Sequence, residues 1–367
     1  MNYSSRQKNI AQALDEPRLD ALLITHLPNV RYLCGFTGSS GVLAFARGEW
    51  AFFTDGRYTE QARQQVKSAQ IIVDASAPLV QAARWIASRF RQTNRRVQLG
   101  VEGEHLTLAM QKRVQAEIGG SKSKARFRLV STADLVEKFR MRKDHEEISA
   151  IRKAVQLASG IFPAVIDAMD SRATENEIAA ELEHFARRAG AEKMSFETIV
   201  AAGPHSAMPH ARPTHKRVGS GFVVLDYGVI LGGYCSDMTR TVHAGRMSKN
   251  ARDLYSAVLA AQLAGISAVR AGVQAGQVDR AAREVLARHK LDQYFTHSLG
   301  HGVGLEIHEA PRLAKGQTTV LEKGMVVTIE PGAYIPGSGG VRIEDMVLVT
   351  ANGCEVLTPT PKELVTC

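Results

Sequence analysis

Two aspartates flanking a short glycine-containing segment are the first residues whose spacing could support chemistry. Asp226 ends an apolar run, and the stretch Val229–Gly233, which contains two glycines, lies between it and Asp237. If this stretch forms a hairpin centred between Leu231 and Gly232, paired residue numbers sum to 463, and the two aspartates face each other with Cβ atoms about 4.5–5.5 Å apart. Like charges placed opposite destabilise a sheet unless a cation lies between them. The pair therefore predicts a cation site, with an exposed acidic pair as the alternative.

Three of the twelve histidines fall within residues 297–309, namely His297, His301 and His308. A lone histidine is usually an ordinary core or surface residue, but three among closely spaced glycines favour a ligand cluster, since glycine allows close backbone approach. The glycine spacing is not that of a dinucleotide-binding loop, and the chain lacks the phosphate-binding loop motif with lysine. The segment is therefore predicted to contribute imidazoles to a site.

Three charged residues lie at the end of or within strand-like runs nearer the C-terminus. The apolar run 325–329 ends at Glu330, and a carboxylate at the end of a buried strand is costly unless it is paired or binds a metal. A strand over 341–349 would place Arg342 and Glu344 on one face. Glu344 would then join the cluster, and Arg342 would hold a ligand carboxylate from behind; taken alone, the two could equally be a surface ion pair.

Together these patterns predict a centre with two metal ions. Its ligands would be Asp226, Asp237, His301, Glu330 and Glu344. Four carboxylates are balanced by two divalent cations, and oxygen ligands with one imidazole suit Mn²⁺ first, with Co²⁺ or Zn²⁺ possible. Two such ions can activate a water molecule and stabilise the tetrahedral intermediate of acyl transfer.

The elements that must position these residues form two predicted domains. Alternating strand and helix signals in residues 1–131, with strands at 19–25, 42–45, 50–54 and 97–101, indicate an α/β domain with a mixed sheet. Residues 132–142 are predicted as the linker. Residues 143–367 begin with long helices that carry the capping boxes Asp144–Glu147 and Thr174–Glu177, and further helices are expected at 249–271 and 277–290. Strands at 222–227, 235–242, 325–329 and 341–349 make this an α+β domain.

Composition excludes several classes of protein. The net charge is +9, but the basic residues of 84–96 and 122–128 are not interleaved with stacking aromatics, so no nucleic-acid partner is expected. Four cysteines without a C-x-x-C pair fit a reducing compartment. The polar residues 1–16 predict no signal peptide, and no apolar stretch approaches a membrane span. We therefore expect a cytoplasmic protein with no membrane partner.

The ordered motifs from about residue 143 onward resemble those of the pita-bread metallopeptidases, which include prolidase, aminopeptidase P and methionine aminopeptidase. The resemblance implies a C-terminal pita-bread domain, a smaller N-terminal creatinase-type α/β domain, and the five metal ligands named above, with Asp237 bridging the ions. It also implies that Glu330 shuttles protons and that His210, His297 and His308 assist substrate binding and the transition state.

Within that family, the N-terminal domain and the Arg342 motif resemble the Xaa-Pro branch, which implies short proline-containing peptides as substrates. Arg312 matches an arginine that in some prolidases contacts the substrate carboxylate; a surface arginine is the alternative. A homodimer is expected. The rival hypotheses are an aminopeptidase of broader or methionine specificity and a non-catalytic pita-bread protein that binds peptides. The complete ligand set argues against the latter.

Overall fold

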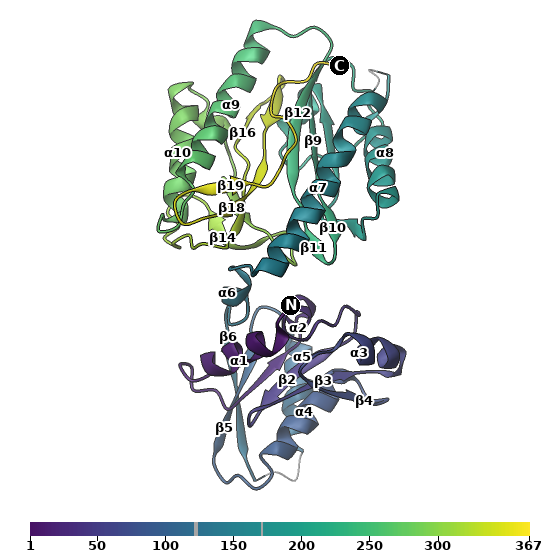
Figure 1. The fold of residues 1–367 in the computed structure, drawn as a ribbon, viewed down its shortest axis with the longest axis vertical. Helices are drawn as coiled ribbons and strands as arrows, with labels where there is room; N and C mark the ends of the chain where they lie inside the picture. Colours follow the sequence, from purple (N-terminus) through teal and green to yellow (C-terminus); the bar gives the residue numbers. More distant parts are fainter. Residues whose placement is uncertain (121–123, 170–171) are drawn as a thin grey trace. The chain divides into compact units, whose positions relative to one another are not determined.

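The chain forms two compact units, Met1–Arg140 and Met141–Cys367. The computed structural model describes residues 1–120, 124–169 and 172–367 (Figure 1). No helix in these described ranges combines the length and apolar character needed to cross a membrane.

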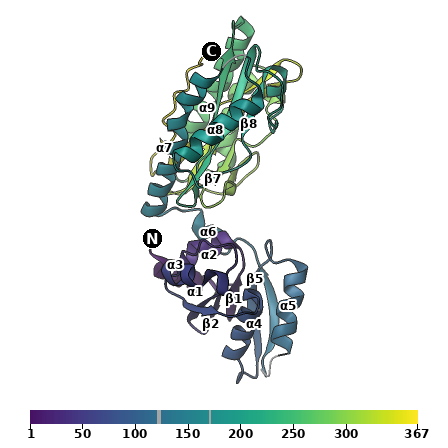
Figure 2. The ribbon, with the colours of Figure 1, turned by 90° about the vertical axis from the view of Figure 1, so that its right-hand side faces the viewer.

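The N-terminal unit is built on a six-stranded mixed sheet in the order β4-β3-β2-β1-β5-β6. Strands β1–β2 and β2–β3 pair antiparallel, and the other neighbours pair parallel. Helices α4 and α5 cover one face, where their apolar side chains share a core with the strands, and α1 to α3 lie toward the other face (Figure 2). The mixed α/β sheet predicted from the sequence is thereby confirmed.

The elements of this unit are β1 (Ala21–Ile24), β2 (Val42–Ala46), β3 (Glu49–Thr54), β4 (Gln70–Val73), β5 (Arg96–Glu102), β6 (Arg126–Thr132), α1 (Tyr3–Ala13), α2 (Leu27–Cys34), η1 (Gly56–Tyr58), α3 (Thr59–Gln65), α4 (Pro78–Arg89), α5 (Leu108–Gly119) and α6 (Glu137–Arg140). Residues 132–142, suggested by the sequence as a linker, thus contain the end of β6 and the short helix α6.

The C-terminal unit contains four antiparallel sheets with helices packed on two sides. Its elements are α7 (His145–Ala168), α8 (Glu175–Arg188), β7 (Lys193–Met194), β8 (Ile199–Ala202), η2 (Gly203–Ala207), β9 (Gly221–Tyr227), β10 (Val229–Leu231), β11 (Tyr234–Cys235), β12 (Met238–Ala244), α9 (Lys249–Ala268), α10 (Ala275–Arg288), η3 (Asp292–Tyr294), β13 (Gly300–Gly302), β14 (Glu309–Leu313), β15 (Val326–Ile329), β16 (Gly332–Ile335), β17 (Gly339–Arg342), β18 (Asp345–Val349) and β19 (Cys354–Val356). The predicted capping boxes at Asp144 and Thr174 are both present and begin α7 and α8.

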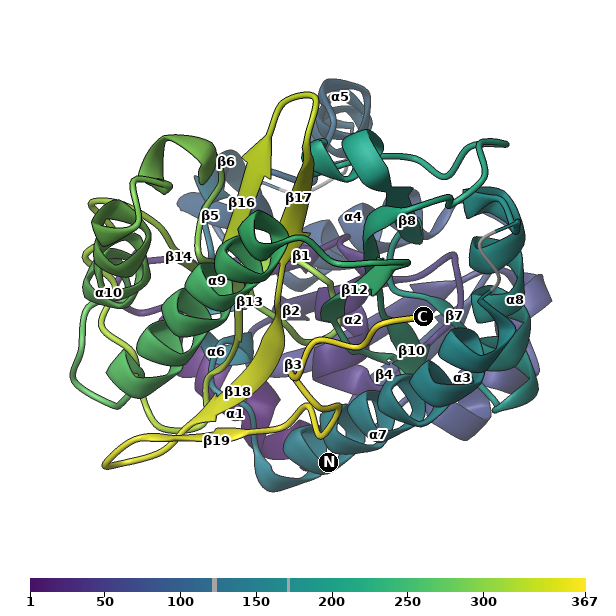
Figure 3. The same ribbon diagram turned by 90° about the horizontal axis from the view of Figure 1, so that it is seen from above.

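Two separate cores divide this unit into halves. Helices α7 and α8 pack with β9 and β12 in one core, and α9 and α10 pack with β15, β17 and β18 in the other. Figures 1 and 3 show the two helix pairs on opposite sides of the strands. The unit is therefore the two-halved, largely antiparallel α+β domain expected from the resemblance.

The predicted register of the aspartate hairpin is wrong by two residues. Asp226 pairs with Thr239, not with Asp237. The turn is centred on Gly232 and Gly233, whose φ angles of 59° and 79° are those of a tight hairpin turn, so Leu231 pairs with Tyr234. Asp237 lies in the gap between β11 and β12, and the two carboxylates are not placed directly opposite each other.

The strand predicted over 341–349 is also not continuous. It ends at Arg342 in β17 and resumes at Asp345 in β18. Between them Glu344 donates its backbone N–H to the carbonyl of Thr239 at 3.1 Å, outside the ladders of both strands. Alternation along a single strand therefore does not explain how Arg342 and Glu344 reach the same place.

Candidate metal-dependent active site

All ten residues that the sequence nominated line one cavity of about 1080 Å³ in the C-terminal unit. They are His210, Asp226, Asp237, His297, His301, His308, Arg312, Glu330, Arg342 and Glu344. Apolar side chains of Phe196, Ile199 and Ile307 line the same cavity. The structure thus joins residues from both halves of the unit in one concave site.

Four of the five predicted ligands come from the ends or interruptions of strands, and His301 lies within one. Asp226 is the penultimate residue of β9, and Asp237 occupies the gap before β12. His301 is the middle residue of β13, whose glycine neighbours allow close packing: a Cβ on Gly300 would lie 2.0 Å from the Thr328 carbonyl oxygen. Strand irregularity therefore frees these side chains to converge.

Three of these side chains lie at the separations expected of metal ligands. Donor atoms of Asp237, His301 and Glu344 all lie within 4.8 Å of one another. The His301 Nε2 atom is 3.6 Å from Asp237 Oδ2 and 3.5 Å from Glu330 Oε1. His301 Nδ1–H donates to the Gly302 carbonyl at 3.0 Å, which leaves the Nε2 lone pair facing the carboxylates. Burial lowers the pKa of His301 to about 4, so the ring is neutral, as a ligand must be.

Burial and mutual repulsion oppose ionisation of the carboxylates. Burial is the largest cause of the raised pKa values of Asp237 and Glu330, and the charge of Glu344 is the next. Burial raises the pKa of Glu344 to about 8, with repulsion from Asp226 as the next cause. Glu344 would therefore keep its proton at neutral pH, and bound cations would favour the ionised form of all three carboxylates.

One carboxylate oxygen of Asp226, in the same cavity, needs a partner that donates a hydrogen bond or carries positive charge. The Oδ1 atom of Asp226 is buried and receives no hydrogen bond from any residue that the structure describes. A buried carboxylate oxygen without a donor is costly, and a cation would satisfy it. This oxygen, the neutral imidazole and the crowded carboxylates fit a pair of divalent cations.

Arg342 and Thr239 hold the carboxylates from behind. Arg342 is 3% exposed; its Nη2 donates to Asp226 Oδ2 at 2.5 Å and its Nη1 to the Tyr334 hydroxyl at 2.7 Å. Its Nε donates to Thr239 Oγ1 at 3.1 Å, and that hydroxyl donates to Glu344 Oε2 at 2.7 Å. One guanidinium and one hydroxyl therefore orient the carboxylate of Asp226 in β9 and that of Glu344 between β17 and β18.

Of the three histidines around the cluster, His297 is held by hydrogen bonds, whereas His210 and His308 are exposed to the cavity. His297 Nδ1–H donates to the Ser298 carbonyl at 2.8 Å, and its Nε2 lies 2.9 Å from the Tyr334 hydroxyl. Burial lowers the pKa of His297 to about 3, which keeps the ring neutral. His210 and His308 are exposed at the cavity, and burial of part of the His308 ring together with nearby His210 lowers the His308 pKa.

Arg312 lies beside the cluster on β14, where it is the register partner of His301. It is exposed toward the cavity and forms no ion pair with any residue in the described ranges. A guanidinium in this position is available to an anionic group of a ligand.

Glu175 is a buried residue of this region that sequence reasoning missed. It is 1% exposed at the start of α8, and its carboxylate accepts hydrogen bonds from Ala202 N, Thr214 N and Thr214 Oγ1, while His205 Nδ1 lies 2.8 Å away. Its hydrogen bonds to Ala202 and Thr214 hold both ends of the segment that contains His210. The sequence showed only the capping box next to Glu175. No pattern in the neighbouring residues reveals that a carboxylate accepts hydrogen bonds from residues far away in the sequence.

Comparison with known proteins covers nearly the whole chain. Residues 149–351 match Metallopeptidase family M24, and residues 6–142 match the Creatinase/Prolidase N-terminal domain. The Xaa-Pro dipeptidase of Pyrococcus furiosus is 37% identical over 364 residues, which is 98% of this chain and 99% of that protein. The structure of Xaa-Pro dipeptidase from Bacillus anthracis is 39% identical with a TM-score of 0.93 and covers 100% of both chains. That of X-Pro aminopeptidase from Thermotoga maritima is 32% identical with a TM-score of 0.87, covering 97% and 100%.

Proposed function

We propose, because the chain belongs to metallopeptidase family M24, that it hydrolyses the bond between an N-terminal residue and a following proline in short peptides. Full-length similarity to proteins named Xaa-Pro dipeptidase supports the substrate class. The observation that carries the chemistry is the convergence of four carboxylates and His301 on one open cavity.

We assign the metal ligands to Asp226, Asp237, His301, Glu330 and Glu344, and propose Mn²⁺ as the native ion, with Co²⁺ or Zn²⁺ able to replace it. A pair of such ions, when bound, acts as a Lewis acid that activates water and polarises the peptide carbonyl. The raised pKa values of the carboxylates and the bare Oδ1 of Asp226 support this assignment.

Glu330 is placed to move a proton. Its side chain is 16% exposed and opens onto the cavity, unlike the deeply buried Glu344. Thr328 Oγ1 donates to its Oε1 at 3.4 Å. Hydrolysis of an Xaa–Pro bond requires protonation of the leaving prolyl nitrogen, and a carboxylate that can accept and then donate the proton within the cavity supplies this step.

The open histidines suit the developing oxyanion. His308 keeps a neutral ring near pH 7 because its pKa is lowered, so it can donate an N–H without bringing a charge that would repel the ions. His308 stands edge to face against His301, with ring centroids 4.4 Å apart. The His308 ring therefore lies beside the proposed ligand cluster. His210 faces the same cavity, and we propose that it assists in the same way.

Peptide length is decided at Arg312. In a dipeptide the proline itself carries the terminal carboxylate, which would lie close to the cluster and within reach of a guanidinium beside His301. A longer peptide has an uncharged amide at that place. We therefore propose a dipeptidase, with an Xaa-Pro aminopeptidase, like the similar Thermotoga maritima protein, as the second candidate.

Hydrolysis of Ala-Pro, Ala-Pro-Ala, Ala-Ala and Met-Ala by the Mn²⁺-loaded protein tests the proposal. Release of proline from Ala-Pro, lost on chelation and restored by Mn²⁺, is expected, with slower cleavage of the other three. Preference for Met-Ala would indicate a methionine aminopeptidase. No cleavage of any peptide by protein that contains two ions would refute the enzymatic function.

A further inference from the structure

A second group of metal-ligating side chains lies in the N-terminal unit. The only histidines in residues 1–140 are His26 and His105, although 79 residues separate them, and their rings stack with centroids 3.5 Å apart. Glu137 Oε1 lies 4.0 Å from His26 Nδ1 and 3.8 Å from His105 Nε2. Donor atoms of these three residues all lie within 4.8 Å of one another. Nothing in the proposed peptidase mechanism uses them.

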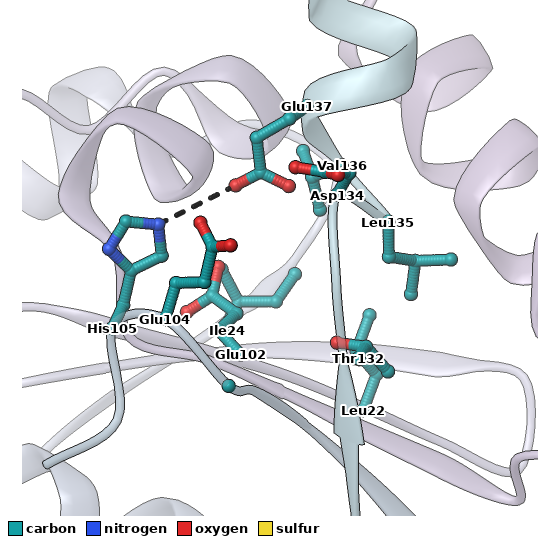
Figure 4. A pocket seen from close by; sticks show the side chains of 11 residues that line it. Leu22, Ile24, Glu102, Glu104, His105, Thr132, Asp134, Leu135, Val136 and Glu137 are labelled. Atoms are coloured by element: carbon teal, nitrogen blue, oxygen red, sulfur yellow. Dashed lines mark ion pairs between the residues drawn. The ribbon is translucent and has the colours of Figure 1, made fainter.

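These side chains come from three different elements. His26 is the residue directly before α2, His105 lies in the connection between β5 and α5, and Glu137 is the first residue of α6. Figure 4 shows Glu137 and His105 facing each other across a small cavity. The fold thus brings the two imidazoles and the carboxylate together from distant parts of the sequence.

Buried polar residues hold this group in place. Asn29 is fully buried; its Nδ2 donates to Glu137 Oε1 at 2.5 Å and to Glu102 Oε1 at 2.8 Å, and its Oδ1 accepts from Arg140. Glu102 Oε2 accepts from the backbone N–H of His26 at 2.8 Å. Such hydrogen bonds behind a ligand are typical of metal sites, because they fix the position of the carboxylate and of the chain that carries the imidazole.

The cavity beside the group has the size and charge for one small cation. Its volume is about 10 Å³, near the minimum that holds a single water molecule. Four carboxylates line it, from Glu102, Glu104, Asp134 and Glu137. The negative charge of these four carboxylates favours a cation and disfavours an anion.

We propose that His26 Nδ1, His105 Nε2 and a Glu137 carboxylate oxygen bind a third divalent cation, separate from the ions of the C-terminal unit. Two imidazoles and one carboxylate suit Zn²⁺ or Co²⁺ better than Mg²⁺ or Ca²⁺, which prefer oxygen ligands only. Bonds of about 2.0–2.1 Å in a tetrahedral site place ligand atoms roughly 3.3 Å apart. The present separations of 3.8 and 4.0 Å must therefore contract by about 0.5 and about 0.7 Å.

Binding also requires one ring to turn. The two rings are within 5° of parallel, and a nitrogen lone pair lies in the plane of its ring, so two stacked rings cannot both point at one ion. The His105 side chain is 31% exposed and that of His26 is 15% exposed, so we expect His105 to be the ring that turns. The bound ion would connect α6 to β5 and α2, and would thereby stabilise the N-terminal unit by mass action.

The test counts ions on the full-length protein. Protein loaded with excess Zn²⁺ and then passed through a desalting column should hold three ions per chain by elemental analysis. His105→Ala and Glu137→Gln should each hold two and keep the wild-type rate on Ala-Pro after Mn²⁺ loading. His184→Asn, which removes an exposed imidazole of the C-terminal unit, is the matched control and should keep three.

A second variant separates this proposal from the proposed function. Asp237→Asn should lose ions of the C-terminal unit while the third remains, and Zn²⁺ should still raise its thermal midpoint; in the double variant with His105→Ala that increase should disappear. Equal numbers of ions in wild-type protein and in His105→Ala would overturn the third site. Three ions without Ala-Pro hydrolysis would overturn only the proposed peptidase activity.

Discussion

Binding of divalent ions to the metal-free protein at pH 7 should release protons, because burial and mutual repulsion raise the pKa values of Asp237, Glu330 and Glu344, three of the proposed ligands. Glu344 is 2% exposed, and burial raises its pKa to about 8, so at pH 7 it carries about 0.9 of a proton. Asp237 and Glu330 also have raised pKa values and add to this number. A carboxylate must ionise to bind a metal, so these protons leave when the ions enter.

The same shift makes the stability of the metal-free protein depend on pH. Glu344 binds its proton more tightly in the folded state than in the unfolded state, where its pKa is near 4.5. The contribution of Glu344 to the free energy of unfolding is therefore complete below pH 4.5 and is lost as the pH rises toward 8. A difference of 3.5 pKa units corresponds to about 5 kcal/mol, at about 1.4 kcal/mol per unit. Bound ions should remove most of this dependence.

Calorimetric titration of Mn²⁺ into metal-free protein provides the measurement. The apparent binding enthalpy is recorded at pH 7 in buffers of different ionisation enthalpy, and the slope gives the number of protons released. We expect at least about 0.9 per chain at pH 7 and fewer at pH 8.5, where Glu344 alone would retain about 0.2. The His105→Ala background keeps the third site out of the count. A slope of zero at pH 7 would show that the carboxylates are already ionised and would refute this reasoning.

Three further predictions concern single side chains of the cavity. Glu330→Gln should lower kcat by about 10²- to 10⁴-fold with little change in KM, and a variant within threefold of wild type would remove Glu330 from the mechanism. Arg312→Ala should raise KM for Ala-Pro by about 10- to 150-fold and hardly affect Ala-Pro-Ala; equal losses on both would make Arg312 structural. His297 stays neutral when folded, since its pKa is about 3, while the unfolded residue gains a proton below pH 6.5. Relative to His297→Gln, the unfolding free energy of wild-type protein should therefore fall by about 2 kcal/mol from pH 6.5 to 5, and parallel pH profiles in urea would contradict this.

The elements and the site residues could be predicted where the signal is local. Capping boxes at Asp144 and Thr174 begin the helices as expected, because the capping hydrogen bonds join residues three apart. Carboxylates that end apolar runs, such as Asp226 and Glu330, are recognisable because burial of an unpaired charge is costly. These rules need no knowledge of what packs against the segment.

Contacts between distant segments could not be predicted in this way. Glu175 meets Thr214 and His205, and Asn29 meets Glu137 and Arg140, through hydrogen bonds that join residues 30 to 111 positions apart. No periodic pattern distinguishes such buried acceptors and donors from ordinary polar residues. The proximity of His26 and His105 could not be predicted from the sequence for the same reason.

The error in the hairpin register has a structural consequence for the site. With Thr239 opposite Asp226, a hydroxyl lies between the guanidinium that holds Asp226 and the carboxylate of Glu344. Thr239 Oγ1 can accept from Arg342 and donate to Glu344 at once, which an aspartate in its place could not do. Displaced from the ladder, Asp237 is free to approach His301 at 3.6 Å. The two-residue difference in register therefore removes a direct acidic pair and creates a shared support for carboxylates of both halves.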